Sequence, residues 1–262
     1  MLRQMYTAGT AMLAYSRQMD TITNNLSNVE TSGYKSDTLV TRSFRDMLIS
    51  RMNDPNARRY DGVGPHNTGI HVDQIFTSFA QGAFDTTDLT TDLAIAGEGF
   101  FCIDYSTETE DGDFTELEYY TRHGAFNVDG EGVLVTGEGR RVLGETGEIY
   151  VGSTDFTVGP NGIVYDAEGY EIDRLRIVRF EDNTALRKVG HNMFTNYDPN
   201  GENEPEEIEA EVKQGYLEAS NVDTARETVM MMQVFRAYEI NQRVLRMVDD
   251  SLGRAVNDIA RL

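Results

Sequence analysis

The stretch MYTAGTAMLAYSRQMDTITNNLSNVETSGYK (residues 5–35) decides how the chain begins. Apolar residues recur in it at alternating intervals of three and four, which places one narrow stripe along one face of an α-helix. We predict a helix of about 28 residues that stops at Gly33, because glycine commonly ends helices. The stripe consists of Met5, Ala8, Met12, Tyr15, Met19, Ile22, Leu26 and Val29.

Three asparagines, Asn24, Asn25 and Asn28, lie near the end of this predicted helix. Asparagine is a poor helix former, because its side chain competes for backbone hydrogen bonds. Two explanations fit the spacing equally well. The asparagines either cap the helix end or form a polar seam that aligns neighbouring helices in an assembly.

The C-terminal residues repeat the heptad pattern over a longer run. Residues 222–262 contain no proline and one glycine, Gly253, so we predict one helix of roughly 35–40 residues with Asn221 or Asp223 as its N-cap. Its one polar stripe member is Asn241, and a buried asparagine in a coiled coil fixes register at a cost in stability. The stripe consists of Met231, Val234, Tyr238, Asn241, Leu245, Val248, Leu252, Ala255, Ile259 and Leu262, and it is widened by Val244, Met247 and Val256.

The middle of the chain is rich in glycine and has a periodicity of two. FNVDGEGVLV (126–135) and FTVGPNGIVY (156–165) both read as strand, tight turn and strand, and they match each other thirty positions apart. EIDRLRIVRF (171–180) reads as a further strand. We therefore predict an α+β fold, with long terminal helices forming a coiled-coil core and a mainly antiparallel all-β middle domain. The predicted domains are 1–35 with 214–262 (helical core), 36–75 (extended basic connector) and 76–213 (outer β domain).

Charge is distributed unevenly. The net charge is −21, but residues 1–30 and 222–262 are each neutral, while residues 60–221 hold nine basic against thirty-three acidic residues. Such a middle argues against nucleic acid as a partner, because phosphate contacts need Lys and Arg. Neutral ends suit surfaces that meet one another. No stretch is apolar for long enough to span a membrane, and the start lacks the apolar core of a cleavable signal peptide.

No motif indicates a reaction, so we predict no catalytic, cofactor-binding or metal-binding residue. His66 and His71 lie close in sequence but lack the further ligands that a metal site needs. Cys102, the single cysteine, follows two phenylalanines and is typical of a small buried residue.

Four blocks resemble the family of bacterial flagellar rod, hook and hook-associated proteins. They are NNLSNVETSGYK (24–35), DLAIAGEGFF (92–101), YTRHGAFNVDGEGVLV (120–135) and QGYLEASNVDTARETVMMMQVFRAYEINQRV (214–244). The first departs from the family at Ser27, where alanine is usual. Together the blocks touch nearly the whole chain in order. The length and the extra segment 41–62 look most like the distal rod protein or its close rod relative, in which such a segment is thought to stiffen the polymer.

The resemblance implies a structural, non-enzymatic subunit of the flagellar basal-body rod. Its terminal helices would polymerise into a rigid axial tube that transmits torque and forms part of the export channel, and would be largely disordered before assembly. The implied partners are copies of the chain itself, other rod and hook proteins and the flagellar type III export apparatus, without membrane insertion. The interface residues would be Met5, Met12, Met19, Ile22, Asn24, Asn25, Leu26, Asn28, Gly33, Asn221, Val234, Tyr238, Asn241, Leu245, Val248, Leu252 and Ile259.

Two other functions remain open on the sequence. One is a monomeric, secreted carbohydrate-binding or glycosidase-like β domain with a helical clasp, although the chain has no Trp for sugar stacking. The other is a hook or hook-junction component of the same family.

Overall fold

The computed structural model describes residues 2–50, 62–105, 107–108, 114–115, 117–198, 201 and 203–259. The chain divides into two compact units. Unit 1 combines residues 1–27, 37–76 and 223–262, and unit 2 combines residues 28–36 and 77–222. The α+β class predicted from the sequence is confirmed. Residues 28–35 and 214–222, which the prediction assigned to the helical core, belong to unit 2.

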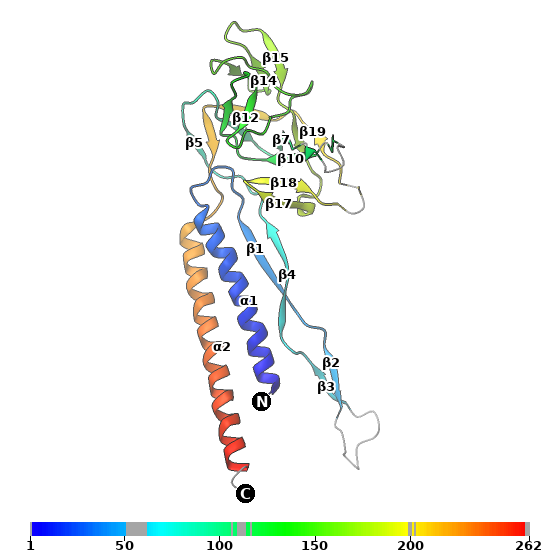
Figure 1. Ribbon diagram of the computed structural model, residues 1–262, viewed down its shortest axis with the longest axis vertical. Coiled ribbons are helices and arrows are strands. Elements are labelled where there is room, and N and C mark those ends of the chain that lie inside the picture. The colour runs from blue at the N-terminus through cyan, green and yellow to red at the C-terminus, as the bar shows by residue number, and fades with distance from the viewer. Residues whose placement is uncertain are drawn as a thin grey trace. The chain divides into compact units, whose positions relative to one another are not determined.

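Unit 1 contains two long helices, α1 (Leu2–Ser27) and α2 (Thr224–Ile259), which run antiparallel and side by side (Figure 1). At about 1.5 Å per residue, their lengths are roughly 39 and 54 Å, so α2 extends well past the start of α1. The predicted stop at Gly33 was wrong, because α1 ends at Ser27 and a turn follows. The C-terminal helix begins after Asp223, whose Oδ1 accepts hydrogen bonds from the amides of Ala225 (3.0 Å) and Arg226 (3.1 Å). Asp223 is therefore the N-cap, rather than Asn221.

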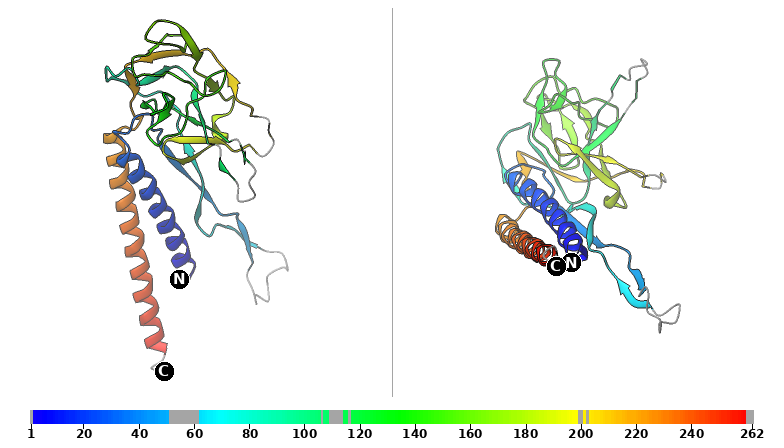
Figure 2. Two further views of the ribbon diagram at one scale, coloured as in Figure 1. Left: turned by 45° about the horizontal axis from the view of Figure 1, so that its top comes forward. Right: turned by 60° about the horizontal axis from the view of Figure 1, so that its bottom comes forward.

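Unit 1 also contains a ribbon of four strands. Strand β1 (Asp37–Ser43) pairs with β4 (Ile70–Thr77), and β2 (Met47–Ser50) pairs antiparallel with β3 (Gly62–His66). The predicted extra segment 41–62 falls on this ribbon, but its residues 51–61 lie outside the described part. The ribbon backbone at Gly69 lies so close to Thr10 of α1 that a Cβ would clash, and its φ of +132° also favours glycine. The right-hand view in Figure 2 shows the same helices and ribbon after a turn of 60° about the horizontal axis.

Unit 2 is built from antiparallel strands. Its largest sheet has six strands in the order β17–β18–β10–β7–β16–β19. A three-stranded sheet has the order β13–β14–β15. Four two-stranded sheets pair β20 with β6, β21 with β5, β11 with β12 and β8 with β9. The bounds are β5 (Phe84–Thr86), β6 (Leu93–Ala96), β7 (Phe100–Asp104), β8 (Thr107–Glu108), β9 (Phe114–Thr115), β10 (Glu118–Thr121), β11 (Phe126–Val128), β12 (Leu134–Thr136), β13 (Thr157–Val158), β14 (Ile163–Tyr165), β15 (Glu171–Arg174), β16 (Ile177–Arg179), β17 (Leu186–Gly190), β18 (Met193–Asn196), β19 (Glu206–Glu207), β20 (Glu211–Gln214) and β21 (Tyr216–Glu218), with a 3-10 turn, η1, at Asn183–Ala185.

The two predicted hairpins are confirmed, as β11 with β12 and β13 with β14. The single strand predicted over residues 171–180 was wrong. It divides into β15 and β16, which belong to different sheets, because the chain changes partner between Arg174 and Ile177. Side chains from both hairpins and from β7 fill one apolar core, in which Phe101, Phe126 and Phe156 are at most 1% exposed.

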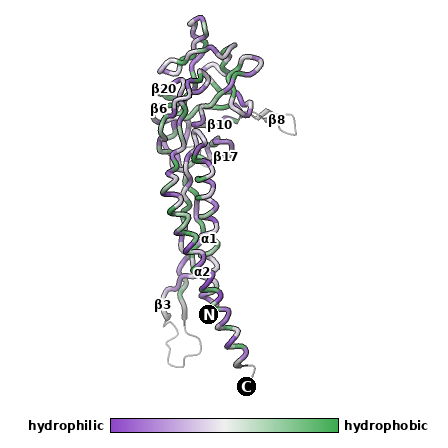
Figure 3. The backbone as a smooth tube through the Cα atoms, turned by 90° about the vertical axis from the view of Figure 1, so that its left-hand side faces the viewer, coloured by the Kyte–Doolittle hydropathy of each residue, from purple (hydrophilic) through white to green (hydrophobic). Residues whose placement is uncertain are grey.

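Apolar and polar residues alternate along both helices (Figure 3). No helix within the described residues is long and apolar enough to cross a membrane.

Candidate assembly interface

The two predicted stripes are the inward faces of the helical pair. Ala8 and Ile22 of α1 are 4% and 3% exposed, and Val234 and Val248 of α2 are 6% and 9% exposed. The remaining stripe members of both helices are half-buried, and the helices contact each other along their lengths. The stripes are therefore used first within the chain. These half-buried members are Met5, Met12, Tyr15, Met19, Leu26, Met231, Tyr238, Asn241, Leu245, Leu252 and Ala255. Ile259 ends α2, and its side chain is outside the described part.

A second row, with four apolar and four charged members, runs along the opposite face of α2. Each of its members lies two positions from a stripe residue, which turns the side chain by roughly 200° around the helix. Val229, Met232, Ile240 and Met247 are 48%, 49%, 58% and 57% exposed in this row. We call the following set the outer row of α2: Val229, Met232, Arg236, Ile240, Arg243, Met247, Asp250 and Arg254. Met247 was predicted to widen the inward stripe, but it lies in the outer row and is 57% exposed, so this prediction was wrong. Val256, predicted to do the same, is 63% exposed.

The asparagines near the end of α1 serve different purposes. Asn25 is 1% exposed. Its side-chain amide nitrogen donates to the backbone oxygen of Asp37 (2.8 Å), and its side-chain oxygen accepts from the backbone N–H of Asp37 (2.9 Å). This pair ties the last turn of α1 to the first residue of β1 inside unit 1. Asn28 accepts a hydrogen bond from the Thr31 hydroxyl (3.3 Å), and Asn24 is exposed. Both of these hydrogen bonds of Asn25 are therefore made within the chain.

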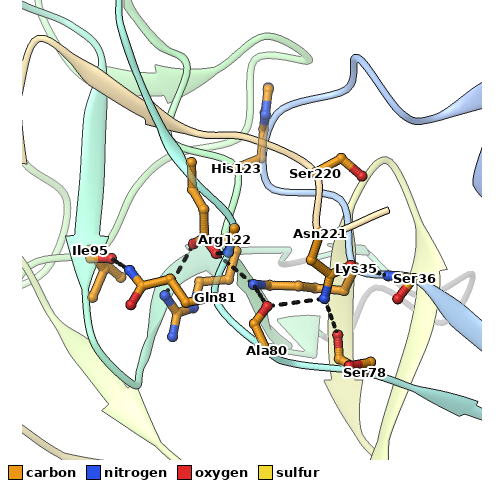
Figure 4. Close-up of polar contacts among 12 residues, drawn as sticks. Lys35, Ser36, Ser78, Ala80, Gln81, Ile95, Arg122, His123, Ser220 and Asn221 are labelled. Carbon is orange, nitrogen blue, oxygen red and sulfur yellow. Dashed lines mark hydrogen bonds and ion pairs between the residues drawn. The ribbon is translucent and has the colours of Figure 1, made fainter. Parts of the chain in front are cut away.

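The two asparagines in the C-terminal region also bond within the chain. Asn221 accepts from the amide of Ser36 (2.8 Å) and donates to the backbone oxygens of Ser78 (2.8 Å) and Ala80 (3.0 Å) (Figure 4). It therefore joins three segments of unit 2 that are distant in sequence. Asn241 on α2 donates to the backbone oxygen of Ala237 (2.8 Å), one turn earlier in its own helix.

A buried ion network lies beside Asn221 in unit 2. The Glu218 carboxylate on β21 contacts Lys35 Nζ at 2.6 Å and Arg122 at 3.1 Å, and it accepts from the amide of Gly82 at 2.9 Å. Lys35 and Glu218 are each 1% exposed, and Arg122 is 5% exposed. Lys35 also donates to the Ala80 oxygen (2.9 Å) (Figure 4). One buried carboxylate thus neutralises two buried cations.

Burial sets the electrostatics of this network. Desolvation lowers the pKa of Lys35 below its usual value of 10.5, against the opposing effect of the Glu218 carboxylate. The same desolvation lowers the pKa of Arg122, again opposed by Glu218. Arg122 also donates to the Gly97 oxygen (2.6 Å) and lies 5.4 Å from the centre of the Phe100 ring. Glu218 is therefore the carboxylate that both cations contact, and Glu98 adds a weaker attraction for Arg122.

Two glycines let the backbone close around the network. Gly33 has a φ of +67°, and a Cβ there would lie 2.5 Å from the backbone nitrogen of His123. At Gly82 a Cβ would clash with the backbone oxygen of Ala219. A side chain at either position would push the N-terminal turn or the β4–β5 connection out of place. Gly33 is thus a packing residue of unit 2 rather than a helix stop.

Lys35, Arg122 and Glu218 lie in sequence blocks that resemble the family, but no role was predicted for them. Their opposite charges are the feature that could have pointed to a pairing. Each block carries an ionisable residue among small and apolar neighbours, and buried charges occur in proteins mainly as pairs. Spacing could not reveal the pairing, because the three residues come from positions far apart in the chain.

The described residues offer no chemistry beyond these contacts. No group of three or more His, Cys, Asp or Glu among them is arranged to hold a metal ion. Cys102 is fully buried, and burial raises the pKa of its thiol to about 12.

Comparison with known proteins decides the family. Three family models match the chain in order: "Flagella basal body rod protein" at residues 5–35, "Flagellar hook protein FlgE/F/G D1 domain" at 94–172 and "Flagellar basal body rod FlgEFG protein C-terminal" at 213–258. The flagellar basal-body rod protein FlgG of Borreliella burgdorferi is 34% identical over 98% of each chain. The chain belongs to the flagellar basal-body rod protein family.

Two other relatives in the rod protein family show how the similarity spreads. The flagellar hook-basal body complex protein FlhO of Bacillus subtilis is 30% identical over the whole of both chains. The rod protein FlgF of Caulobacter vibrioides is 30% identical over 98% of this chain and 97% of its own. The chain is thus a structural subunit of the flagellar basal-body rod, located in the basal body. Family membership favours this function over a hook component and over a carbohydrate-binding β domain.

Proposed function

We propose that the chain polymerises through unit 1 into a rigid tube, with unit 2 as its outer domain. The observation that carries the proposal is the set of four apolar side chains in the outer row of α2, Val229, Met232, Ile240 and Met247, which the rest of the described chain leaves exposed. Burying four half-exposed side chains would contribute about 3–6 kcal/mol per subunit. That gain reaches only the lower end of the roughly 4–15 kcal/mol that association costs. The row therefore suits a tube wall, in which every subunit makes several such contacts, better than an isolated dimer.

The third face of α2 begins with the exposed Phe235 and is polar from Glu239 onward, and this polar part suits a channel. Glu239, Gln242, Arg246 and Asp249 are all exposed and lie on one side of the helix, between the stripe and the outer row. Acidic and basic groups are mixed there, so the face presents no strong field to a passing polypeptide. We assign this face to the lumen through which other proteins are exported.

The predicted interface residues take a supporting part in this account. The stripe positions would hold α1 against α2 as a coiled-coil pair, and Asn25 and Asn221 would fix the connections at the ends of that pair. The helical pair would then act as one rigid element of the tube. Rigid packing is what a shaft that transmits torque requires.

The charge pattern supports the same arrangement. The acidic residues 60–221 would face outward and keep free subunits apart, while the neutral ends meet in the tube. The partners we propose are copies of the chain, other rod and hook proteins, and the flagellar type III export apparatus, which would move the chain without a cleaved signal. We propose no enzymatic activity, no nucleic acid and no membrane insertion.

Sedimentation of the purified full chain tests the proposal. Ile240→Asp should abolish the sedimenting polymer, because a carboxylate without a partner costs several kcal/mol to bury. Gln242→Asp is the matched control, two residues away on the exposed polar face of the same helix. It should sediment like the parent chain. If Ile240→Asp assembles as the parent does, the outer row is not an assembly contact.

A further inference from the structure

Unit 1 contains a groove between α1 and the ribbon of β1 and β4, with a volume of about 520 Å³. Its α1 wall is formed by residues from Thr10 to Asn24 that lie two positions from stripe residues. Two positions turn a side chain by roughly 200°, so this wall is the face of α1 opposite α2. β1 contacts α1 in this region (Figure 1).

The groove is lined and edged by apolar side chains. Leu13 on α1 is 65% exposed and Ile75 on β4 is 47% exposed, and both line it. Phe44 and His71 stack at 4.9 Å between ring centres and also line it. Leu13 and Ile75 therefore give the groove an exposed apolar rim, which a docked apolar side chain would cover.

We propose that this groove receives the outer row of α2 from a second copy of the chain. The chain's own α2 cannot occupy it, because that helix packs on the opposite face of α1. The α1 wall from Thr10 to Asn24 is roughly 21 Å long, so it would cover part of the apolar segment of the outer row, which from Val229 to Met247 is roughly 27 Å long. The inference rests on the proposed polymer and names the two surfaces that meet in it.

Charge favours the same pairing. The outer row carries Arg236, Arg243 and Arg254 against one acid, Asp250, and these arginines form no ion pair with any other described residue. The groove is lined by two acids, Asp20 and Asp37, against one base, Arg17. A basic row therefore meets an acidic groove. This complementarity would set the register in which the apolar side chains enter.

The geometry also determines the kind of assembly. The groove and the outer row are different surfaces on opposite sides of the helical pair, so filling one leaves the other available. Such a head-to-tail contact repeats from copy to copy, and it gives an open helical polymer whenever the rotation does not close. A contact of this kind extends a rod, whereas a self-complementary contact would stop at a dimer.

Cysteine cross-linking in assembled rods tests the pairing. The chain has one native cysteine, Cys102, which is fully buried and will not compete for the reagent. Cells would carry Leu13→Cys with Ile240→Cys in one chain as their only copy, and isolated basal bodies would be treated with a short bismaleimide. Leu13→Cys with Met247→Cys is a second pair on the same surfaces. Leu13→Cys with Gln242→Cys is the matched control.

We expect a ladder of cross-linked multimers from the first two pairs and none from the control or from the single variants. Rods that form without a ladder in either pair would overturn the groove pairing and leave the rod function standing. Dimers from Leu13→Cys alone, or a cross-link to another protein, would also overturn it. If the cells with the parent chain contain no rods that include it, the proposed function itself fails.

Discussion

Removing the charge of Glu218 should destabilise unit 2 more than any single surface change. Glu218→Gln keeps the shape and one acceptor oxygen, so the Gly82 amide at 2.9 Å can stay satisfied. It leaves Lys35 and Arg122, 1% and 5% exposed, without the carboxylate that both contact. Breaking a buried ion pair by removing one partner costs about 3–5 kcal/mol.

That loss should be visible as a large shift in melting temperature. For a unit of this size, each kcal/mol lowers Tm by about 2–4 °C, so Glu218→Gln should lower it by roughly 6–20 °C. The assay is thermal unfolding of the purified full chain followed by near-ultraviolet circular dichroism. Glu206→Gln is the matched control, because Glu206 pairs with Arg179 at 2.7 Å but the two side chains are 66% and 45% exposed. That change should cost less than about 1 kcal/mol.

A second variant checks the reasoning against a general sensitivity of the site. Lys35→Met removes one of two cations, so Glu218 keeps Arg122 and the Ala80 oxygen keeps the Asn221 donor at 3.0 Å. It should therefore cost less than Glu218→Gln. The charge account is refuted if Glu218→Gln melts within a few degrees of the Glu206→Gln control, or if Lys35→Met is the more damaging change.

Three further outcomes are expected. Burial lowers the pKa of Lys35, so between that lowered pKa and 10.5 the unfolded chain binds more protons than the folded chain. The free energy of unfolding of the parent chain, measured against that of Lys35→Met, should therefore rise with pH through this window. Urea titrations at a series of pH values measure it. Asn25→Ala leaves both backbone groups of Asp37 without their amide partners and should cost roughly 2–4 kcal/mol by chemical denaturation, while the exposed Thr23→Ala should change little. Cys102 is fully buried and has a thiol pKa of about 12, so at pH 8 it should not react with a thiol reagent in the native chain and should react fully in denaturant. If it reacts in the native chain as fast as in denaturant, its burial is contradicted.

Helical periodicity predicted the two long helices and their inward faces. The heptad spacing of α1 and α2 selects Ala8, Ile22, Val234 and Val248, all of which are buried, but it misses Ala14 and Asn25, which are 3% and 1% exposed. The pattern failed where two apolar faces share one helix. Met247 is close in sequence to stripe residues, so it was assigned to the inward stripe. It belongs to the outer row instead, which the sequence hides because arginines stand between its apolar members.

The end of α1 was harder to read, because glycine has more than one use. Gly33 was taken as a helix stop, yet its positive φ and its close approach to His123 belong to the packing of unit 2. A long-range contact of this kind has no local signature. The same holds for Asn25, whose partner at Asp37 lies beyond the turn, and whose spacing was equally consistent with a cap or an intermolecular seam.

The ion network illustrates what only a three-dimensional structure can supply. Lys35, Arg122 and Glu218 are separated by most of the chain, and thirty-three acids in residues 60–221 leave no means of choosing one carboxylate from sequence. Burial makes the choice. A carboxylate that is 1% exposed must lie next to its counter-ions, whereas an exposed one need not.

Hydrogen exchange of the purified full chain before and after assembly tests the central claim most directly, which is that α1 and α2 are the polymerisation element. The account predicts that amides of α1 and α2 exchange faster in the monomer than those of the unit 2 core, and become strongly protected in sedimented polymer. If both helices are already as protected in the monomer as the unit 2 core and assembly changes nothing, the helices are an intramolecular clasp and the claim is contradicted.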